Sequence, residues 1–484
     1  MSLATLGVDV YQLTTLLAHA RQGRVTAEGT GQQVRMAFFF RKLPRQRNFV
    51  VTAGLRSIVE HCQSLRLSED ELRTIREHPL LRPALAGPEG RAVLRALESL
   101  DGFVGEIDAV AEGTLSFAGP ARLTGGEPAL AAGVPLSAYT PLLQVRTDMV
   151  LAKLIETPWL CRLNHMSMVA SKAARVVLAA RYDGVDRPVI EFGQRRTHPA
   201  AAIDAAYAAY LAGCRATSNL AATHVYGIPS VGTMDHFAVQ AAERAELPLG
   251  ETEASFFRTF CELFPHAATL LVDTYDTWGG IGRAVQAGGE RLHGVRIDSN
   301  VTPETIQRAR ALLAELGAPH VTLFVSDALD EWRVRELARA GADGFGVGEN
   351  ITCSPDAAAG VGAVGKLVEN GYGKRTMKIS RGSGKTTLPG PLQAYRYSDH
   401  DLLALAEEAV PAGGRPLLQP LWRGRAPVAP LPPLEELRAR VRADIDALPP
   451  HLRGLETDHG QPWTLVLSDG LYGLIQRLLG EATA

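Results

Sequence analysis

Short apolar runs alternate with longer amphipathic stretches between residues 189 and 348. Each run is too short for a buried helix and is followed by polar or glycine residues, so we expect strands. The expected strands are residues 189–192, 228–231, 269–272, 294–297, 321–325 and 344–347. This alternation predicts a parallel, right-handed β/α arrangement that closes, or nearly closes, into a barrel.

Start and stop signals support the helices between these strands. One helix is expected to have Thr302 as its N-cap, Pro303 in its first turn and Gly317 at its end. Another is expected over residues 329–340, with Gly341 ending it.

The chain before this region has a different pattern. A strand is expected at residues 34–40, and residues 69–103 have apolar positions at helical spacing. Residues 104–145 alternate short β-prone pieces with Gly and Pro, which predicts a small β-rich or α/β sandwich. Residues 149–180 predict a long helix, interrupted near Pro158.

The segment after residue 385 is rich in Pro and Gly before helical patterns return at residues 434–448 and 468–479. We interpret it as a tail that packs back on the N-terminal domain. The predicted fold is therefore α/β: an irregular parallel β/α barrel plus an N-terminal α/β sandwich-like domain completed by the C-terminal tail. The predicted domains are residues 1–150, 151–384 and 385–484.

Composition narrows the possible functions. The 484 residues are 46% hydrophobic and 21% charged, with a formal net charge of -2 and no basic run. These values favour an ordinary globular protein and argue against nucleic acid or a membrane as its main partner. The five cysteines are far apart, which favours reduced thiols over disulfides or a zinc site: Cys62, Cys161, Cys214, Cys261 and Cys353. We expect a cytoplasmic enzyme with no dedicated metal site.

Polar, ionisable and glycine residues follow every expected strand of the barrel, where loops converge on one mouth. They include Arg195, Arg196, Thr233, His236, Asp273, Asp276, Arg296, Asp298, Ser326, Gly346 and Gly348. The arginines could hold phosphates or a carboxylate, and glycines allow backbone N–H groups to approach a phosphate. Together they indicate a phosphorylated, anionic small-molecule substrate.

Each of these features also has an ordinary structural interpretation. The G-x-G sequence occurs in tight turns, paired arginines are often surface charges, and an Asp after a strand is often an N-cap. A single histidine such as His236 is more often packed or solvated than catalytic. Because polar, ionisable and glycine residues recur at all six expected strand ends, a substrate-binding site is favoured over these ordinary roles.

Many short motifs, in the same order, resemble the nicotinate phosphoribosyltransferase family over nearly the whole chain. They are D-V-Y-Q-L-T from Asp9, F-F-F-R-K from Phe38, A-G-L from Ala53, S-K-A-A-R from Ser171, F-G-Q-R-R from Phe192, A-T-S-N from Ala216, G-I-P-S-V-G-T-M-D-H from Gly227, L-V-D-T-Y-D-T from Leu271, G-V-R-I-D-S from Gly294, G-F-G-V-G from Gly344, K-L-V-E from Lys366 and T-L-P-G from Thr387.

The resemblance implies a reaction that joins nicotinate to 5-phosphoribosyl-1-pyrophosphate, forming nicotinate mononucleotide on the route to NAD. ATP is the implied co-substrate, hydrolysed through a transient phosphohistidine, and Mg²⁺ is expected with the phosphoribosyl donor. By resemblance, His236 is the phosphorylated residue and Asp273 orients it; Asp298 is the third predicted catalytic residue.

The resemblance also implies the nicotinate site. The ring would stack between Phe192 and Tyr11 of a partner subunit, which predicts a homodimer with shared active sites. Arg296 serves the nicotinate, with Arg195 as a second candidate. Ser218 stands where nicotinamide-using relatives carry an aspartate, which favours acid over amide. Further predicted contacts are Thr233 with substrate, and Arg196, Gly346 and Gly348 with phosphate.

The chain departs from the usual family pattern at five positions: Asp235, Phe237, Asn300, Val301 and Glu349. Three alternatives therefore stay open. One is a relative that uses nicotinamide or another pyridine, and another is a degenerate member that binds nucleotides without turnover. The third, an unrelated β/α-barrel lyase, would leave the motif at Tyr11 unexplained.

Overall fold

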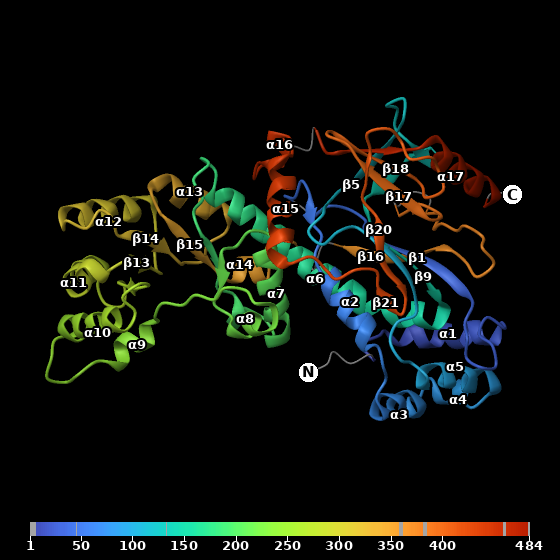
Figure 1. Cartoon of the computed structure of the whole chain (residues 1–484), viewed down its shortest axis with the longest axis horizontal. Coiled ribbons are helices and arrows are strands. Elements are labelled where there is room, and N and C mark those ends of the chain that lie inside the picture. Colours follow the sequence, from blue (N-terminus) through green and yellow to red (C-terminus); the bar gives the residue numbers. More distant parts are fainter. Residues whose placement is uncertain are drawn as a thin grey trace. The chain divides into compact units, whose positions relative to one another are not determined.

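The computed structural model describes residues 6–44, 46–131, 133–357, 362–380, 385–457 and 461–482. The chain divides into two compact units (Figure 1). The first unit takes the described residues of Met1–Met168 and Ala357–Ala484, and the second is Val169–Asp356.

The second unit is built on a parallel sheet with the strand order β11-β10-β15-β14-β13-β12. The strands are β10 (Val189–Glu191), β11 (Ala216–Thr217), β12 (Thr269–Leu271), β13 (Gly294–Ile297), β14 (Thr322–Val325) and β15 (Gly344–Val347). The predicted α/β class with a parallel β/α domain is confirmed. The described strands form a curled half-barrel, with β11 and β12 as its two edges, rather than a closed barrel.

One expected strand is absent from this sheet. Residues 228–231 form no strand; Ser230 alone makes a parallel bridge to Thr217 of β11. Pro229 lacks an N–H group, and β11 offers only two residues for pairing, so the ladder cannot extend. The prediction at this segment was wrong, although its last residues still lead to the helix that begins at His236.

Helices lie between the strands of the second unit (Figure 1). They are α7 (Pro199–Leu211), α8 (Leu220–Tyr226), α9 (His236–Ala241), α10 (Leu249–Leu263), α11 (Thr277–Gly288), α12 (Pro303–Glu315), α13 (Glu331–Ala340) and α14 (Glu349–Thr352), with 3-10 turns η1 (Gln194–Arg196), η2 (Gly289–Arg291) and η3 (Pro355–Ala357). The cap predicted for α12 is confirmed, because the Thr302 side chain accepts a hydrogen bond from the Thr305 N–H. Gly341 ends α13 at a φ of 107°, a conformation that favours glycine.

The first unit contains two six-stranded sheets. One is antiparallel, in the order β16 (Ala363–Glu369), β1 (Gln33–Phe40), β9 (Pro141–Asp148), β3 (Gly105–Ala109), β20 (Gln419–Gly424) and β21 (Ala426–Pro427). The other is mixed, in the order β19 (Arg415–Pro416), β17 (Leu392–Arg396), β18 (His400–Leu405), β22 (Thr464–Leu467), β5 (Ala118–Leu123) and β8 (Ser137–Tyr139). Two small antiparallel sheets pair β2 (Val50–Val51) with β4 (Leu115–Ser116), and β6 (Leu130–Ala131) with β7 (Val134–Pro135).

Several helices complete the first unit. They are α1 (Val10–Arg21), α2 (Leu55–Ser64), α3 (Glu69–Glu77), α4 (Arg82–Leu85), α5 (Pro88–Glu98), α15 (Leu434–Asp446), α16 (Pro450–Arg453) and α17 (Asp469–Glu481), together with the first part of α6 (Met149–Ala180). Strands from the C-terminal segment pair with N-terminal strands: β20 with β3, and β22 with β5.

The unit boundaries differ from the predicted domain limits after residues 150 and 384. Helix α6 is continuous and supplies residues to both units. Strand β16, predicted to belong to the barrel, pairs with β1 of the first unit. Residue 384 itself lies outside the described residues.

The interruption predicted near Pro158 does not occur, since α6 runs unbroken from Met149 to Ala180. The next residue, Trp159, is fully buried, with its ring 5.8 Å from Phe38 and 5.7 Å from Phe103. Burial of such large aromatic side chains contributes more than the roughly 3 kcal/mol that proline costs within a helix. The consecutive phenylalanines of β1 follow from the same packing, because both faces of this strand are covered.

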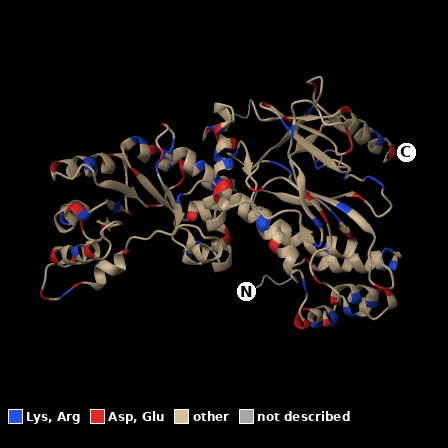
Figure 2. Ribbon diagram, in the orientation of Figure 1, with Lys and Arg blue, Asp and Glu red and all other residues tan. Residues whose placement is uncertain are grey.

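Basic and acidic side chains are interspersed over the helices of both units (Figure 2). All five cysteines are free, as their spacing predicts. Within the described residues, no helix combines the length and apolar character needed to cross a bilayer.

Candidate active site

Side chains from the carboxyl ends of β12, β13 and β14, and from the start of α9, form one cluster in the second unit, joined by hydrogen bonds and by the 3.8 Å approach of His236 Nε2 to Asp298 Oδ2. Its members are Thr233, His236, Asp273, Thr274, Arg296, Asp298 and Ser326. The carboxyl ends of parallel strands meet at one edge of a sheet, which is where α/β proteins bind ligands. We call this group the strand-end cluster.

Arg296 is the centre of the strand-end cluster. It lies on β13, is 9% exposed, and donates from Nε to Ser326 Oγ over 2.7 Å. Its Nη1 donates to Thr233 Oγ1 and to the Met234 carbonyl, each over 2.9 Å. Three neutral acceptors therefore fix the guanidinium, and its charge is partly offset only by Asp298, whose Oδ2 is 3.6 Å from Nη2, among the ion pairs of the described residues.

Asp298 follows β13 and faces the same guanidinium. Its Oδ1 accepts a 2.6 Å hydrogen bond from Ser326 Oγ, while Oδ2 lies 3.6 Å from Arg296 Nη2. The Asp298 N–H donates to Asp273 Oδ2 over 2.9 Å. The other oxygen of Asp273, Oδ1, is buried and has no hydrogen-bond partner among the described residues.

His236 begins α9 and remains partly exposed, with 38% of its side chain accessible. Its Nδ1 is 3.1 Å from Thr274 Oγ1, and its Nε2 is 3.8 Å from Asp298 Oδ2. Within the described part of the chain, no hydrogen bond joins His236 to Asp273. The structure therefore differs from the predicted contact: Asp273 acts on the backbone of Asp298, and Thr274 holds the imidazole.

Asp235 has a clear local role beside this histidine. Its side chain is the N-cap of α9 and accepts a 2.9 Å hydrogen bond from the Ala238 N–H. A short helix needs such a cap, because its first N–H groups have no partner inside the helix. The departure from the family pattern at this position therefore helps to place His236. Phe237, by contrast, is 74% exposed, and nothing in the structure explains it.

Phe192 follows β10 and provides the aromatic surface of the site. The Arg296 guanidinium carbon lies 5.9 Å from the centroid of its ring, and Phe324 packs beside it with ring centroids 6.0 Å apart. Gly346 is buried in β15, and a Cβ there would collide with the Phe192 ring. Gly346 thus makes room for this ring, a role that differs from the predicted approach to phosphate.

Glu191 is a buried carboxylate that sequence reasoning did not place in the site. It accepts hydrogen bonds from the Gly193 N–H, from Thr217 Oγ1 over 2.7 Å and from Thr352 Oγ1 over 3.0 Å. Burial raises the pKa of Glu191, and these three hydrogen bonds oppose that shift. The carboxylate therefore ties the ends of β10 and β11 to α14, next to Phe192.

Other predicted residues lie near this edge without joining the cluster. Arg195 and Arg196 are exposed in η1, and Arg196 Nε is 4.0 Å from Glu349 Oε2. The negative charge of Glu349, which departs from the family pattern, is therefore partly offset by the positive charge of Arg196. Gly348 immediately precedes α14. The half-buried Ser218 donates its N–H to the Glu191 carbonyl over 3.0 Å.

Tyr11 belongs to the first unit, on α1. It is 52% exposed, and its hydroxyl accepts a 3.0 Å hydrogen bond from Gln12 Nε2. Partial burial, followed by the charges of Glu156 and Asp9, raises the pKa of Tyr11, so the phenol stays neutral near pH 7.

Two further departures have local explanations. Asn300 has a φ of 52°, and asparagine is among the few residues besides glycine that tolerate this region. Val301 is 1% exposed, and its N–H donates to Asp327 Oδ2 over 3.4 Å. The turn after β13 is therefore kept, while the carboxylate usual at position 301 is replaced by a core side chain.

Ser326 and Thr274 are site residues to which sequence reasoning gave no role, although Ser326 was among the residues expected at the strand ends. Both follow predicted strands, so their position was a usable signal. Their partners depend on how neighbouring strands align, and that alignment is not visible in either segment alone. Within the described residues, no group of three or more His, Cys, Asp and Glu side chains is arranged to hold a metal ion.

Comparisons with known proteins agree with this geometry. The family model for the nicotinate phosphoribosyltransferase (NAPRTase) N-terminal domain matches residues 6–87, and that for the NAPRTase family matches residues 188–409. The chain is 36% identical over 491 residues to nicotinate phosphoribosyltransferase pncB2 of Mycobacterium tuberculosis, covering 99% of this chain and 95% of that protein. It is 29% identical over 558 residues to nicotinate phosphoribosyltransferase of Bos taurus, covering 97% and 96%.

A solved structure shares the fold over the same extent. The crystal structure of human nicotinic acid phosphoribosyltransferase aligns with a TM-score of 0.76 and 27% sequence identity, covering 97% of this chain and 99% of that one. Family models match both the N-terminal and the central regions, and one relative is 36% identical along nearly its full length. The chain therefore belongs to the nicotinate phosphoribosyltransferase family.

Proposed function

We propose that this enzyme transfers the phosphoribosyl group of 5-phosphoribosyl-1-pyrophosphate to nicotinate, forming nicotinate mononucleotide and pyrophosphate for NAD synthesis. Relatives that carry this activity in their names match the chain over nearly its whole length. The free, widely spaced cysteines support a cytoplasmic location.

The arrangement of Arg296 and Phe192 is the observation that carries this proposal. A fixed guanidinium lies 5.9 Å from the centre of an aromatic ring, at the edge where parallel strands end. Nicotinate is a flat aromatic ring with one carboxylate. Its ring can stack on Phe192 while its carboxylate meets the charge of Arg296.

The transfer itself requires positioned charge more than a base. The bond from ribose C1 to the pyrophosphate oxygen breaks, and its electron pair leaves with pyrophosphate. The pyridine nitrogen supplies the pair for the new C–N bond, and no proton is removed. An Asp298 already bonded to Ser326 suits such a reaction, since it serves to hold Arg296 rather than to accept a proton.

Mg²⁺ would arrive with the phosphoribosyl donor. The described residues offer no complete set of protein ligands, so most of its oxygens would come from the substrate and water. Asp273 fits a supporting role, because its Oδ1 is a buried carboxylate oxygen without a partner among the described residues. The ion would supply positive charge to the departing pyrophosphate.

ATP coupling is assigned to His236. If the imidazole Nδ1–H donates to Thr274, the lone pair lies on Nε2, which can attack the γ-phosphorus of ATP. An N–P bond then forms, the bond from phosphorus to the ADP oxygen breaks, and water later releases phosphate. His236 is exposed enough for this, and its α9 is capped by Asp235.

A homodimer completes the proposal. Tyr11 is an exposed aromatic residue on α1 of the first unit, and the family resemblance implies that it serves the nicotinate site of a partner subunit. Two copies of the chain would then each lend a tyrosine to the other.

Turnover of nicotinate and of nicotinamide, each with the same phosphoribosyl donor, tests the function. The wild type should prefer nicotinate. Arg296→Met should lower kcat/KM for nicotinate by roughly 100-fold, because the loss of a hydrogen bond to a charged group costs about 3 kcal/mol. The exposed Arg291→Met is the matched control and should have no effect. A wild type that uses nicotinamide and ignores nicotinate would refute the proposal in favour of the amide-using alternative.

A further inference from the structure

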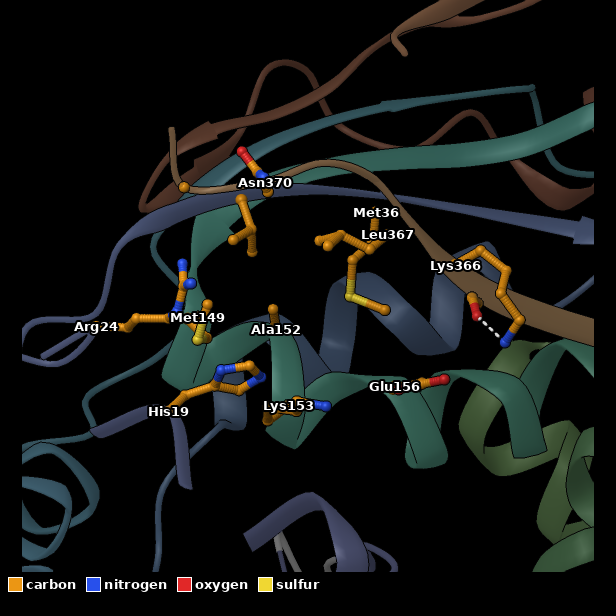
Figure 3. A pocket seen from close by; sticks show the side chains of 13 residues that line it. His19, Arg24, Met36, Met149, Ala152, Lys153, Glu156, Lys366, Leu367 and Asn370 are labelled. Carbon is orange, nitrogen blue, oxygen red and sulfur yellow. Dashed lines mark hydrogen bonds between the residues drawn. The ribbon is translucent and has the colours of Figure 1, made fainter. Parts of the chain in front are cut away.

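The first unit contains a pocket of about 380 Å³, which the proposed reaction does not use. It lies between the end of α1, the first turns of α6, and strands β1 and β16 (Figure 3). Its volume is in the range of small-molecule sites, which are concave, mostly apolar and equipped with a few polar groups.

Positive charge gathers around this pocket. Figure 3 shows His19 and Arg24 at one end, Lys366 at the other, and Lys153 between them on α6. In the described part of the chain, none of Arg24, Lys153 and Lys366 forms an ion pair. Arg24 has the neutral side chains of Gln22 and Gln32 as partners, and Lys366 Nζ donates to the Gly365 carbonyl over 2.6 Å.

The cations are close enough to affect one another. Burial lowers the pKa of Lys153 and of Lys366, and the charge of Glu156 opposes both shifts. For Lys366, the charges of Arg41, Lys378 and Lys153 add to the lowering of its pKa. Burial likewise lowers the pKa of His19, with Lys153 and Arg24 acting in the same direction. Such a group of unpaired, partly desolvated positive charges is costly unless an anion occupies it.

One carboxylate, Glu156, opposes these charges and already accepts a 2.8 Å hydrogen bond from Gln12 Nε2. Glu156 lies with Lys366 at one end of the pocket and offsets its charge, which leaves the two positive charges of Arg24 and Lys153. A phosphomonoester near pH 7 carries about two negative charges and three acceptor oxygens, so it can neutralise this excess and reach cations on different elements. A single carboxylate group would leave one positive charge unbalanced.

Apart from Asn370, the remaining side chains that line the pocket are apolar. Met36 of β1, Met149 of α6 and Leu367 of β16 face the space, as Figure 3 shows for these labelled side chains. Methionine adapts its shape to different apolar ligands. We propose that this pocket binds a phosphomonoester that carries an apolar organic group, with the phosphate between Arg24 and Lys153, at the end of the pocket where His19 lies.

Calorimetric titration of the full-length protein with phenyl phosphate tests the proposal. Lys153→Met and Arg24→Met should each weaken binding at least tenfold, as expected for one charged hydrogen bond of roughly 1.5–3 kcal/mol. Arg82→Met, an exposed position on α4, is the matched control and should bind like the wild type. Inorganic phosphate alone should bind more weakly than phenyl phosphate.

Thermal unfolding separates ligand binding from a structural role of Lys153. Removing a desolvated charge should leave the Tm of Lys153→Met at or above that of the wild type, yet phenyl phosphate should raise only the wild-type Tm. The strand-end cluster also meets phosphates, so Arg296→Met is titrated in parallel and should keep this binding. Loss of binding in Arg296→Met but not in Lys153→Met would overturn the proposal, as would equal affinity for inorganic phosphate. Neither outcome bears on nicotinate turnover.

Discussion

Ser326 joins Asp298 and Arg296 of the strand-end cluster: its Oγ donates a 2.6 Å hydrogen bond to Asp298 Oδ1 and accepts a 2.7 Å hydrogen bond from Arg296 Nε. One hydroxyl therefore sets the positions of a guanidinium on β13 and of a carboxylate that directly follows this strand. Since Ser326 is 6% exposed, water cannot easily replace it.

Ser326→Ala should therefore loosen Arg296. The substitution leaves Arg296 Nε and Asp298 Oδ1 without this partner, at a cost of roughly 1–3 kcal/mol, so kcat/KM for nicotinate should fall about 10- to 100-fold. The loss should appear mainly in KM, because the guanidinium is proposed to bind the substrate carboxylate. Ser326→Thr keeps the hydroxyl and should recover most activity, and the exposed Ser299→Ala should have no effect. Unchanged kinetics in Ser326→Ala would exclude this positioning role.

Sequence patterns were sufficient to predict many of the strands and helices of the second unit. The expected strands at residues 294–297 and 344–347 match β13 and β15, because buried parallel strands are short continuous apolar runs. The failure at residues 228–231 comes from Pro229, which removes a backbone donor, and from the short partner β11. The unbroken helix at Pro158 depends on Trp159, whose buried contacts no local pattern contains.

The residue types of the site could be predicted better than their pairings. Arg296, Asp298 and His236 were expected because they lie at or after the ends of expected strands, and the structure brings them together. The expected contact of Asp273 with His236 is replaced by Thr274, its neighbour in the chain. Adjacent residues after a strand point in different directions, and which one reaches the imidazole depends on the loop conformation.

Thr274 should control the formation of phosphohistidine. Thr274→Val preserves the shape of the side chain but removes the hydroxyl 3.1 Å from His236 Nδ1, so the tautomer with a free Nε2 loses its support. The amount of acid-labile label that the protein takes up from γ-labelled ATP should fall about tenfold, because one lost hydrogen bond costs roughly 1.5 kcal/mol. Thr274→Ser should restore it, and His236→Ala should abolish it. The exposed His224→Ala provides the control. Label retained in His236→Ala would assign the phosphoryl group to another residue.

Ser218 should determine the choice between acid and amide. Ser218→Asp introduces a negative charge in a half-buried position after β11, and this charge would repel the carboxylate of nicotinate. We expect kcat/KM for nicotinate to fall at least tenfold and that for nicotinamide to rise. Ser218→Asn, which has the same shape and no charge, should reduce nicotinate turnover far less. If Ser218→Asp and Ser218→Asn lost kcat/KM for nicotinate equally, the size of the new side chain, and not its charge, would explain the loss.

Tyr11 should act on the active site of the partner subunit. Heterodimers of Tyr11→Ala and His236→Ala chains, purified through two different tags, would combine one intact His236 with one intact Tyr11. With shared sites, one of two sites is complete, and activity should be about half that of the wild-type dimer, although each variant homodimer is inactive. Inactive heterodimers would show that Tyr11 serves its own chain.

Glu112 should make the first unit less stable as pH rises. This carboxyl group is 5% exposed and accepts hydrogen bonds from the Gly54 N–H over 2.7 Å and the Arg56 N–H over 2.9 Å. Burial raises the pKa of Glu112 to about 7, from an ordinary value of 4.5, and those hydrogen bonds only partly offset the shift. Between these two pH values the folded chain holds a proton that the unfolded chain has lost, so the free energy of unfolding falls as pH rises through this window.

The expected loss is about 3 kcal/mol between pH 4.5 and pH 7, since one pKa unit corresponds to about 1.4 kcal/mol. The urea midpoint, followed by tryptophan fluorescence across this range, measures it. Glu112→Gln cannot titrate, so its stability should be lower overall, because one backbone N–H loses its acceptor, yet flatter with pH. The exposed Glu60→Gln should keep the wild-type slope. An unchanged slope in Glu112→Gln would mean that another group causes the pH dependence, and that Glu112 is ionised in the folded chain throughout this range.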